Sequence, residues 1–176
     1  MVFEAELRSF ISKEKYDELI SFFQKNAELL SDTSQETHYL NSDKDLRIQK
    51  NDDYSKIWLK LGKMHDEQRK EIEIRMKSQD FDSLKEIFEI IGFDAKIKWF
   101  RKRKEFSWKG LSICLDNTKG YGYILEIEKL CDSEEEANSA KEEIKQKFLE
   151  LEVIESSKEE FAQKFQDYEK NWRSLI

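Results

Sequence analysis

The feature of this sequence that most constrains its fold is a series of short segments in which charged and apolar residues alternate. The first segment, FEAELR, places Glu4, Glu6 and Arg8 on one side of an extended chain and its apolar residues on the other. Alternation with a period of two is typical of a β-strand with one buried face. The chain must therefore build a sheet that gathers many charges on one face.

The same pattern returns in later segments, so it describes a whole sheet. The residues that share the charged faces are Arg47 with Gln49, Trp58 with Lys60, Arg69 with Glu71, Glu73 and Arg75, Arg101 with Arg103, and Glu126 with Glu128. Any one of these strands could simply turn its charges to water, as antiparallel sheets often do. The acids and bases are, however, sorted by strand, because some strands repeat Glu-x-Glu and others carry only cations.

If such a sheet curls into a barrel, the charged faces can point inward and line a channel. The channel has to be wet, because uncompensated ions in a dry interior are strongly unfavourable. Carboxylate clusters suit Mg²⁺ or Mn²⁺, whereas rows of arginine and lysine suit phosphate oxygens. A metal that bridges the carboxylates to an oligophosphate would satisfy both sets of charges.

The sequence predicts an α+β fold of roughly eight strands and four helices. The strand segments are residues 2–10, 36–40, 45–50, 54–62, 69–77, 95–108, 111–116 and 121–130. The helices are predicted after Ser12 with an apolar stripe that reaches Leu30, from Asp80 or Asp82 to Gly92, from Ser133 to about Glu152, and near residues 157–172. Most connections are too short for crossovers, which favours antiparallel strands.

Composition and charge limit the classes of function. A chain of 176 residues fits one domain, and its net charge of −7 gives no general reason to expect nucleic-acid binding. Alternation splits the basic run RKRK, with Arg101 and Arg103 on one face and Lys102 and Lys104 on the other. No apolar run approaches the ~18 residues of a membrane span, and the N-terminus carries no secretory pattern. We therefore expect a cytoplasmic protein without a membrane partner.

The cysteines and histidines do not suggest a metal site of their own. Cys114 and Cys131 have no metal-type spacing, which predicts free buried thiols in a reducing compartment. His38 and His65 are isolated from each other, and we expect each of them at the surface or at the rim of a site.

Taken in order, the alternating segments resemble the motifs of the CYTH superfamily, the triphosphate tunnel metalloenzymes. This superfamily includes class IV adenylyl cyclases, thiamine triphosphatases and inorganic tripolyphosphatases. Six motifs of the superfamily have similar segments here. E-x-E-x-K is similar to Glu4–Arg8, L-R-x-R to Leu46–Gln49, and T-x-K-G to Trp58–Gly62. R-x-E-x-E is similar to Arg69–Glu73, K-x-R-x-x-Y to Arg101–Phe106, and D-x-V-x-x-L-G-x-F-x-E-I-E to Asp116–Glu128. The resemblance covers about residues 2–130.

The resemblance implies a single domain of residues 1–176, in which an eight-stranded antiparallel β-barrel forms a tunnel with helices packed outside. The tunnel strands would span about residues 2–130 and the C-terminal helices about residues 133–172. The implied triphosphate ligands are Arg8, Arg47, Lys60, Arg69, Arg101 and Arg103. The implied metal ligands or their supports are Glu4, Glu6, Asp116, Glu126 and Glu128. Glu71 and Glu73 are implied as supporting residues, which would bind the same ligands or form ion pairs with the cations. The implied catalytic residues are Glu4, Glu6 and Arg8.

Several positions depart from the family pattern, and three of them bear on the ligands or on the width of the tunnel. Arg8 replaces the usual lysine, which in hydrolytic members is linked to positioning or activating water. Because arginine stays charged and is a poor base, this change weakens the case for hydrolysis more than the case for binding. Gln49 replaces a second arginine and removes one phosphate contact, and Trp58 could narrow the tunnel or stack on a base.

Three functions are compatible with these residues. The first is a class IV adenylyl cyclase-like enzyme that uses Mg²⁺ or Mn²⁺ to convert ATP to cyclic AMP and pyrophosphate. The second is a triphosphatase that hydrolyses tripolyphosphate, thiamine triphosphate or a nucleoside triphosphate. The third is a non-catalytic binder of nucleotides or polyphosphate. The chain length, the segment Asp116–Glu128 and the helical tail look most like the cyclase branch, for which a homodimer would also be consistent.

Overall fold

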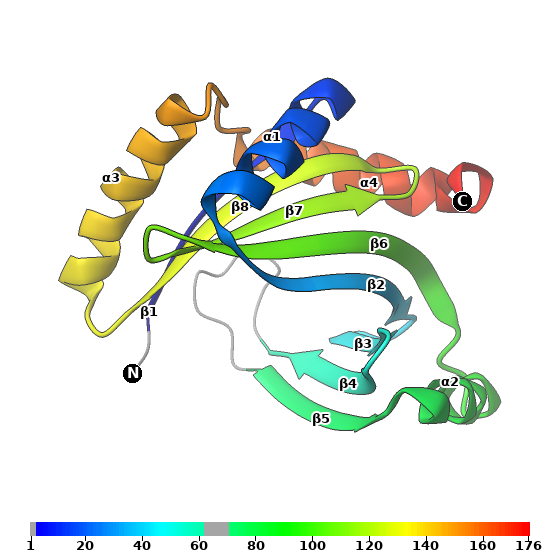
Figure 1. Ribbon diagram of the computed structural model, residues 1–176. Coiled ribbons are helices and arrows are strands. Elements are labelled where there is room, and N and C mark those ends of the chain that lie inside the picture. The colour runs from blue at the N-terminus through cyan, green and yellow to red at the C-terminus, as the bar shows by residue number, and fades with distance from the viewer. Residues whose placement is uncertain (1–2, 62–70) are drawn as a thin grey trace. The chain divides into compact units, whose positions relative to one another are not determined.

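The computed structural model describes residues 3–61 and 71–176, and its eight strands belong to one sheet (Figure 1). The strands are β1 (Phe3–Ile11), β2 (Glu28–Leu40), β3 (Asp45–Lys50), β4 (Tyr54–Lys60), β5 (Glu71–Lys77), β6 (Ala95–Trp108), β7 (Leu111–Thr118) and β8 (Gly122–Cys131). Their hydrogen-bonded order is β1-β8-β7-β6-β2-β3-β4-β5. The pairs β1–β8, β7–β8, β2–β3, β3–β4 and β4–β5 are all antiparallel. The predicted α+β class is confirmed, whereas closure of the sheet into a barrel with a tunnel stays a prediction.

The α-helices are α1 (Lys13–Asn26), α2 (Phe81–Ile90), α3 (Glu134–Glu150) and α4 (Lys158–Leu175), and a 3₁₀-helix, η1 (Ser78–Asp80), precedes α2. Within the described residues, none of these helices has the length and apolar character needed to cross a membrane.

The chain divides into two compact units. The first consists of Met1–Asp32 with Lys102–Tyr168, and the second of Thr33–Arg101 with Glu169–Ile176. Strands β2 and β6 and helix α4 contribute residues to both units. Each unit has its own core. The single-domain interpretation of the sequence stays a prediction.

In the first unit, α1 and α3 cover the apolar face of β1, β7 and β8, and Figure 1 shows both helices on the same side of these strands. Phe23 of α1 is fully buried, and its ring centroid lies 5.6 Å from that of Phe106 and 5.3 Å from that of Trp108. Helix α3 adds Ile144 and Phe148 to the same core. Because successive side chains of a strand point to opposite faces, Glu4, Glu6 and Arg8 of β1 and Glu126 and Glu128 of β8 lie on the other face.

A two-residue turn joins β6 to β7 and fixes their register. Lys109 and Gly110 have φ values of 53° and 78°, the left-handed conformation that a type I′ turn requires at both central positions. Counting back from this turn aligns Arg103 with Asp116, and their side chains are hydrogen-bonded. The turn thus brings a predicted phosphate ligand beside a predicted metal-site residue.

The second unit packs α2 against one face of its strands, around Leu40, Ile48 and Phe81. His38 lies on the same face and is only 1% exposed, so the expected surface or rim role is wrong. Strand alternation turns its ring inward against Phe81, while its Nε2 lies 2.7 Å from Glu36 Oε1. This hydrogen bond lowers the pKa of Glu36 to about 2. His65, the other histidine, lies outside the described residues.

Strand β2 is the main departure from the predicted elements. It begins at Glu28, well before the predicted segment at residues 36–40, so Leu30 belongs to a strand and not to the stripe of α1. Helix α1 ends at Asn26, and both Leu29 and Leu30 are about half exposed. These two leucines therefore add no buried contact to α1. The local pattern of the first residues of β2 is ambiguous, so pairing within the sheet decides their conformation.

Replacing Phe23 with alanine should lower the free energy of unfolding by about 3–5 kcal/mol, because it leaves a cavity among buried aromatic rings. Urea unfolding at pH 7 measures the change. Lys25→Ala, at an exposed position of the same helix, is the matched control and should cost less than about 0.5 kcal/mol. Similar losses for both variants would contradict the assignment of this core.

Candidate active site

The predicted carboxylates of the first unit meet on the charged face of β1 and β8. The antiparallel register places Glu6 directly opposite Glu128, and Arg8 directly opposite Glu126. Glu4 lies on the same face of β1, two residues before Glu6, and is exposed. Two of the Glu-x-Glu segments recognised in the sequence, Glu4 with Glu6 and Glu126 with Glu128, are therefore neighbours in the sheet.

Crowding and burial make these carboxylates costly to ionise together. Burial, followed by the charge of Glu126, raises the pKa of Glu6 from its ordinary value of 4.5 to about 7. The same two causes raise the pKa of Glu128 to about 7, and Glu4 adds further repulsion. The charges of Arg8 and Arg103 oppose the shift at Glu6 but do not cancel it. A bound cation would remove this repulsion.

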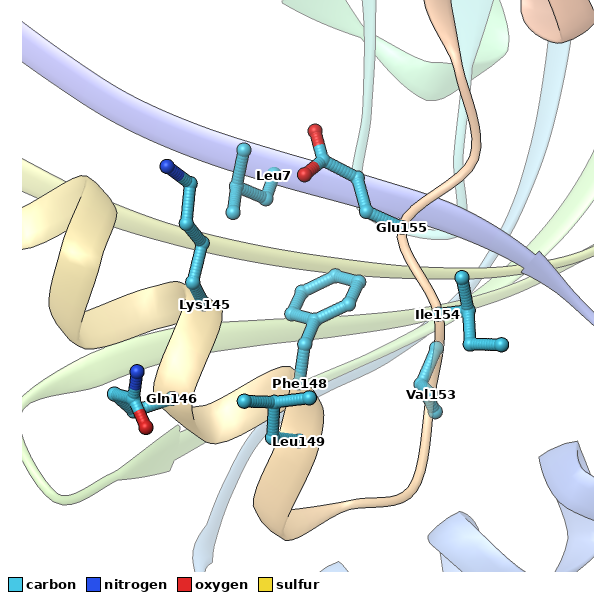
Figure 2. A pocket seen from close by; sticks show the side chains of 8 residues that line it. All are labelled: Leu7, Lys145, Gln146, Phe148, Leu149, Val153, Ile154 and Glu155. Atoms are coloured by element: carbon cyan, nitrogen blue, oxygen red, sulfur yellow. The ribbon is translucent and has the colours of Figure 1, made fainter.

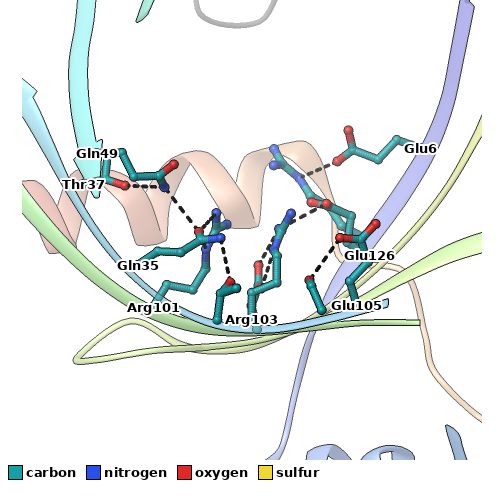
Figure 3. Close-up of polar contacts among 12 residues, drawn as sticks. Glu6, Gln35, Thr37, Gln49, Arg101, Arg103, Glu105 and Glu126 are labelled. Atoms are coloured by element: carbon teal, nitrogen blue, oxygen red, sulfur yellow. Dashed lines mark hydrogen bonds and ion pairs between the residues drawn. The ribbon is translucent and has the colours of Figure 1, made fainter. Parts of the chain in front are cut away.

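Arg103 is bound by two of the predicted metal-site carboxylates, and Figure 3 shows its contact with Glu126. Its Nε and Nη2 donate to the two oxygens of Asp116 at 2.8 and 2.7 Å, and its Nη2 also donates to Glu126 at 3.3 Å. Burial opposes the charge of Arg103, but the hydrogen bond to Asp116 and the charge of Glu126 outweigh it and raise the pKa of Arg103. Because the Asp116 side chain is 3% exposed and both of its oxygens bind Arg103, it fits a supporting role.

Arg8 remains accessible on this face, since its side chain is 52% exposed. Its Nε lies 3.9 Å from Glu6 Oε1, which is a long ion pair. Its guanidinium carbon lies 4.4 Å from the ring centroid of Phe161, at the start of α4. No pattern in the sequence pointed to Phe161, because it belongs to an ordinary amphipathic helix that follows the last motif.

Glu105 is a further acidic residue that the sequence interpretation missed. Figure 3 shows its side chain on the same side of the strands as those of Arg103 and Glu126. Its carboxylate lies 3.4 Å from the Ser31 hydroxyl and 3.5 Å from that of Ser112. The parity of β6 could have identified it, since Glu105 stands two residues after Arg103.

Cys114 also belongs to the charged face, directly opposite Glu126 on the neighbouring strand. It is a free, buried thiol as predicted, and burial raises its pKa well above the usual range. Cys114 stands in the apolar-rich segment 111–115, which by itself would favour a place in the core. The alternation with Leu115 and with Asp116 two residues on shows instead that it points away from the core.

In the second unit, the predicted phosphate ligand Arg47 is held by two hydrogen bonds and an aromatic ring. Its Nε and Nη2 donate to Asp45 at 2.6 and 2.7 Å, and its guanidinium carbon lies 4.3 Å from the Tyr39 ring centroid. Trp58 lies directly opposite Arg47, and Lys60 directly opposite Asp45. Arg47, Trp58 and Lys60 therefore share one face, as the alternation predicted.

Arg101 belongs to an amide network in the second unit (Figure 3). Its Nε and Nη2 donate to Gln35 Oε1 at 3.0 and 2.6 Å. Gln49 donates to the same oxygen at 3.3 Å and to the Thr37 hydroxyl at 2.9 Å. Gln49, which stands where the family has an arginine, thus helps to position the acceptor that holds Arg101.

The supporting residues of β5 are described only in part. Glu73 is bound by Lys56 at 2.7 Å and by Arg75 at 2.6 Å. Burial would raise the pKa of Glu73, but these hydrogen bonds outweigh it and lower the pKa. Glu71 pairs with Lys60 through the backbone register, and Arg69 lies outside the described residues.

A pocket of about 340 Å³ lies elsewhere in the first unit (Figure 2). Its lining includes Leu7 from β1, Phe148 and Leu149 from α3, and Ile154 from the segment after α3. Leu7 packs against the core, on the opposite face of β1 from Glu6. The pocket is therefore separate from the carboxylate face.

The donor chemistry of the first unit fits Mg²⁺ or Mn²⁺. Within residues 3–61 and 71–176, no three carboxylate, histidine or cysteine side chains converge closely enough to hold a metal by themselves. Mg²⁺ is usually bound through one or two carboxylates together with substrate phosphates and water, so a complete protein cage is not needed. The raised pKa values of Glu6 and Glu128 indicate where a cation would be most stabilising.

Glu6→Gln should stabilise the metal-free protein at high pH. Because the pKa of Glu6 is about 7 in the folded state and 4.5 ordinarily, the wild type should lose stability as the pH rises from about 4.5 to 7. Above pH 7 the variant should be more stable by about 1 kcal/mol, a figure reduced for the partial exposure of this side chain. Urea unfolding in EDTA across this pH range measures the difference. A variant that is less stable than the wild type at pH 8 would contradict the crowding of these carboxylates.

Comparisons with known proteins bear on the family and the fold of this chain. A family model described as the CYTH domain matches residues 3–171. The PH1819 protein of Pyrococcus horikoshii OT3 is similar in structure, with a TM-score of 0.68, 26% identity, and coverage of 87% of this chain and 92% of that chain. No curated protein sequence matches this chain.

Two further solved structures share the fold. A conserved hypothetical protein from Pyrococcus furiosus has a TM-score of 0.67 and 24% identity, over 86% of this chain and 91% of that chain. A protein from Bacillus halodurans named "putative adenylate cyclase" has a TM-score of 0.61 and 20% identity, over 88% of this chain and 92% of that chain. Since the family model spans nearly the whole sequence, this chain belongs to the CYTH domain family.

Proposed function

We propose that this protein is a divalent-metal-dependent enzyme that acts on a triphosphate, most simply as an adenylyl cyclase that converts ATP to cyclic AMP and pyrophosphate. The observation that carries the proposal is the pairing of Glu6 with Glu128 and of Arg8 with Glu126 across β1 and β8. This face combines carboxylates that favour a cation with an accessible arginine that favours an anion. A metal–triphosphate complex has both charges.

The carboxylates would hold the metal, with Glu6 and Glu128 as the first candidates. Burial and the charge of Glu126 destabilise the ionised form of both residues, so a cation bound beside them would give the largest electrostatic stabilisation. Glu126 is shared with Arg103, and Asp116 keeps Arg103 in place. Bound Mg²⁺ or Mn²⁺ would neutralise charge that develops on the phosphate oxygens.

The arginines and lysines would bind and orient the triphosphate. Arg8 presents a half-exposed guanidinium beside the carboxylates, and Arg103 is fixed close by. We propose Arg47, Lys60 and Arg101 as further phosphate ligands on the basis of their motif positions, and Arg69 on the same basis alone. Phosphoryl chemistry requires mainly such positioning and charge neutralisation.

Arg8 favours cyclisation over hydrolysis. In cyclisation the nucleophile is the 3′-hydroxyl of the substrate's own ribose, so no protein group has to activate a water molecule. A permanently charged arginine binds phosphate but is a poor base at neutral pH. A triphosphatase is the second candidate, because its metal and phosphate ligands would be the same residues. A non-catalytic nucleotide or polyphosphate binder is the third.

Incubation with ATP or tripolyphosphate and Mg²⁺ or Mn²⁺, followed by chromatography of the products, should yield cyclic AMP and pyrophosphate from ATP. Orthophosphate as the main product would favour the triphosphatase. Tight triphosphate binding in calorimetry without any product would leave only the non-catalytic binder. The absence of both binding and turnover would contradict all three candidates.

Glu6→Gln should lower the rate of metal-dependent turnover by about tenfold to 100-fold. This is the loss typical when the surroundings of a metal site are disturbed. Glu135→Gln makes the same chemical change at an exposed position of α3 and should leave the rate unchanged. Normal metal-dependent turnover by Glu6→Gln would remove Glu6 from the mechanism.

A further inference from the structure

The first turns of α4 touch the same face of β1 that carries the candidate site. Phe161 is 8% exposed, and its ring stacks on that of Phe10 with a centroid distance of 4.4 Å and an interplanar angle of 28°. Phe10 stands two residues after Arg8 and therefore on the same face of β1. Lys164, one turn further along α4, places its ammonium 4.3 Å from the Phe10 ring centroid.

The Phe161 ring also carries the guanidinium of Arg8. The guanidinium carbon lies 4.4 Å from the ring centroid, within the range of a cation–π interaction. A second contact of this side chain is the long 3.9 Å ion pair between its Nε and Glu6. An ion pair of that length defines the guanidinium position poorly, so the aromatic face supplies most of the orientation.

The start of α4 is itself anchored in the first unit, so the ring of Phe161 is a fixed support for the Arg8 guanidinium. The chain between α3 and α4 is bound to β1 through the Ser9 hydroxyl, which donates to the Ile154 carbonyl at 2.5 Å and lies 3.2 Å from the Ser156 hydroxyl. Further along α4, the buried Tyr168 packs edge-on against Tyr121 at 5.6 Å. Phe161 lies between these two anchors.

We infer that Phe161 is a positioning residue for Arg8, which it holds as a pre-oriented phosphate ligand. The inference rests on the proposed triphosphate-binding function. An arginine side chain loses considerable rotamer freedom when it binds a ligand, and a guanidinium already stacked on a ring loses less. A planar guanidinium stacks on an aromatic ring more completely than an ammonium does, so Arg8, where the family has lysine, and Phe161 form a matched pair.

The first test measures the stack itself in the ligand-free protein. The Nε–H resonance of Arg8, assigned by its loss in Arg8→Gln, should show a ring-current shift in the wild type by NMR. Phe161→Leu should abolish this shift, and Phe161→Trp should retain it. An Arg8 resonance that is the same in the wild type and in Phe161→Leu would overturn the inference, whatever the protein binds.

The second test measures the consequence for binding with Mg²⁺ and tripolyphosphate in calorimetry. Phe161→Leu should raise the Kd about threefold to tenfold, and Phe161→Trp should restore it. In an Arg8→Gln background the same Phe161→Leu change should alter the Kd by less than about twofold, because the residue acts through Arg8.

Phe148→Leu is the matched control, since it removes a buried ring from α3 in the core on the other face of β1. Any effect of this variant on the Kd should be the same in the wild-type background and in the Arg8→Gln background. If the wild type binds tripolyphosphate but the effects of Phe161→Leu and Arg8→Gln simply add, the positioning role is overturned while the proposed function stands. A wild type that binds no triphosphate would overturn the proposed function and, with it, the role of Phe161 in binding.

Discussion

The first unit depends on the balance of charge across β1, β8, β7 and β6. Glu6 and Glu128 lie opposite each other, and their pKa values near 7 reflect the cost of burying like charges together. Arg103 offsets part of that cost through Glu126, while Asp116 fixes Arg103 with two parallel hydrogen bonds. The packing of α1 and α3 on the other face maintains this arrangement, because Ala5 and Leu7 of β1 and Leu125 and Ile127 of β8 are committed to the core. The fold thus maintains an unfavourable group of anions, which is the usual situation at a site that binds a cation.

For most of the strands, the alternation of charged and apolar residues was enough to predict the element and the faces it presents. β3 and β6 have the predicted bounds, and Arg47, Trp58 and Lys60 share a face as the pattern required. Two serine caps were also predictable among those observed, since Ser12 and Ser133 accept hydrogen bonds from the first turns of α1 and α3. Period and capping are local properties, so a single sequence contains them.

Other features depend on contacts between distant segments, which local patterns do not encode. The start of β2 follows from pairing within the sheet, and the burial of His38 follows from the position of α2 over its strand. The contact of Phe161 with Arg8 links residues at opposite ends of the chain, and no periodicity points to it. Glu105 and Cys114 are different, since parity alone would have placed them on the charged face. The family motifs specify Arg103 and Asp116 on the same two strands but neither of these residues.

The central claim is that the carboxylates of β1 and β8 hold a divalent cation together with the triphosphate. The most direct measurement is anomalous diffraction from crystals grown with Mn²⁺ and a non-hydrolysable ATP analogue. The account predicts a manganese peak between the triphosphate oxygens and the carboxylates of Glu6 or Glu128, with the guanidinium of Arg8 on the phosphates. A triphosphate bound without manganese at these carboxylates, or manganese bound only at a distant surface site, would contradict it.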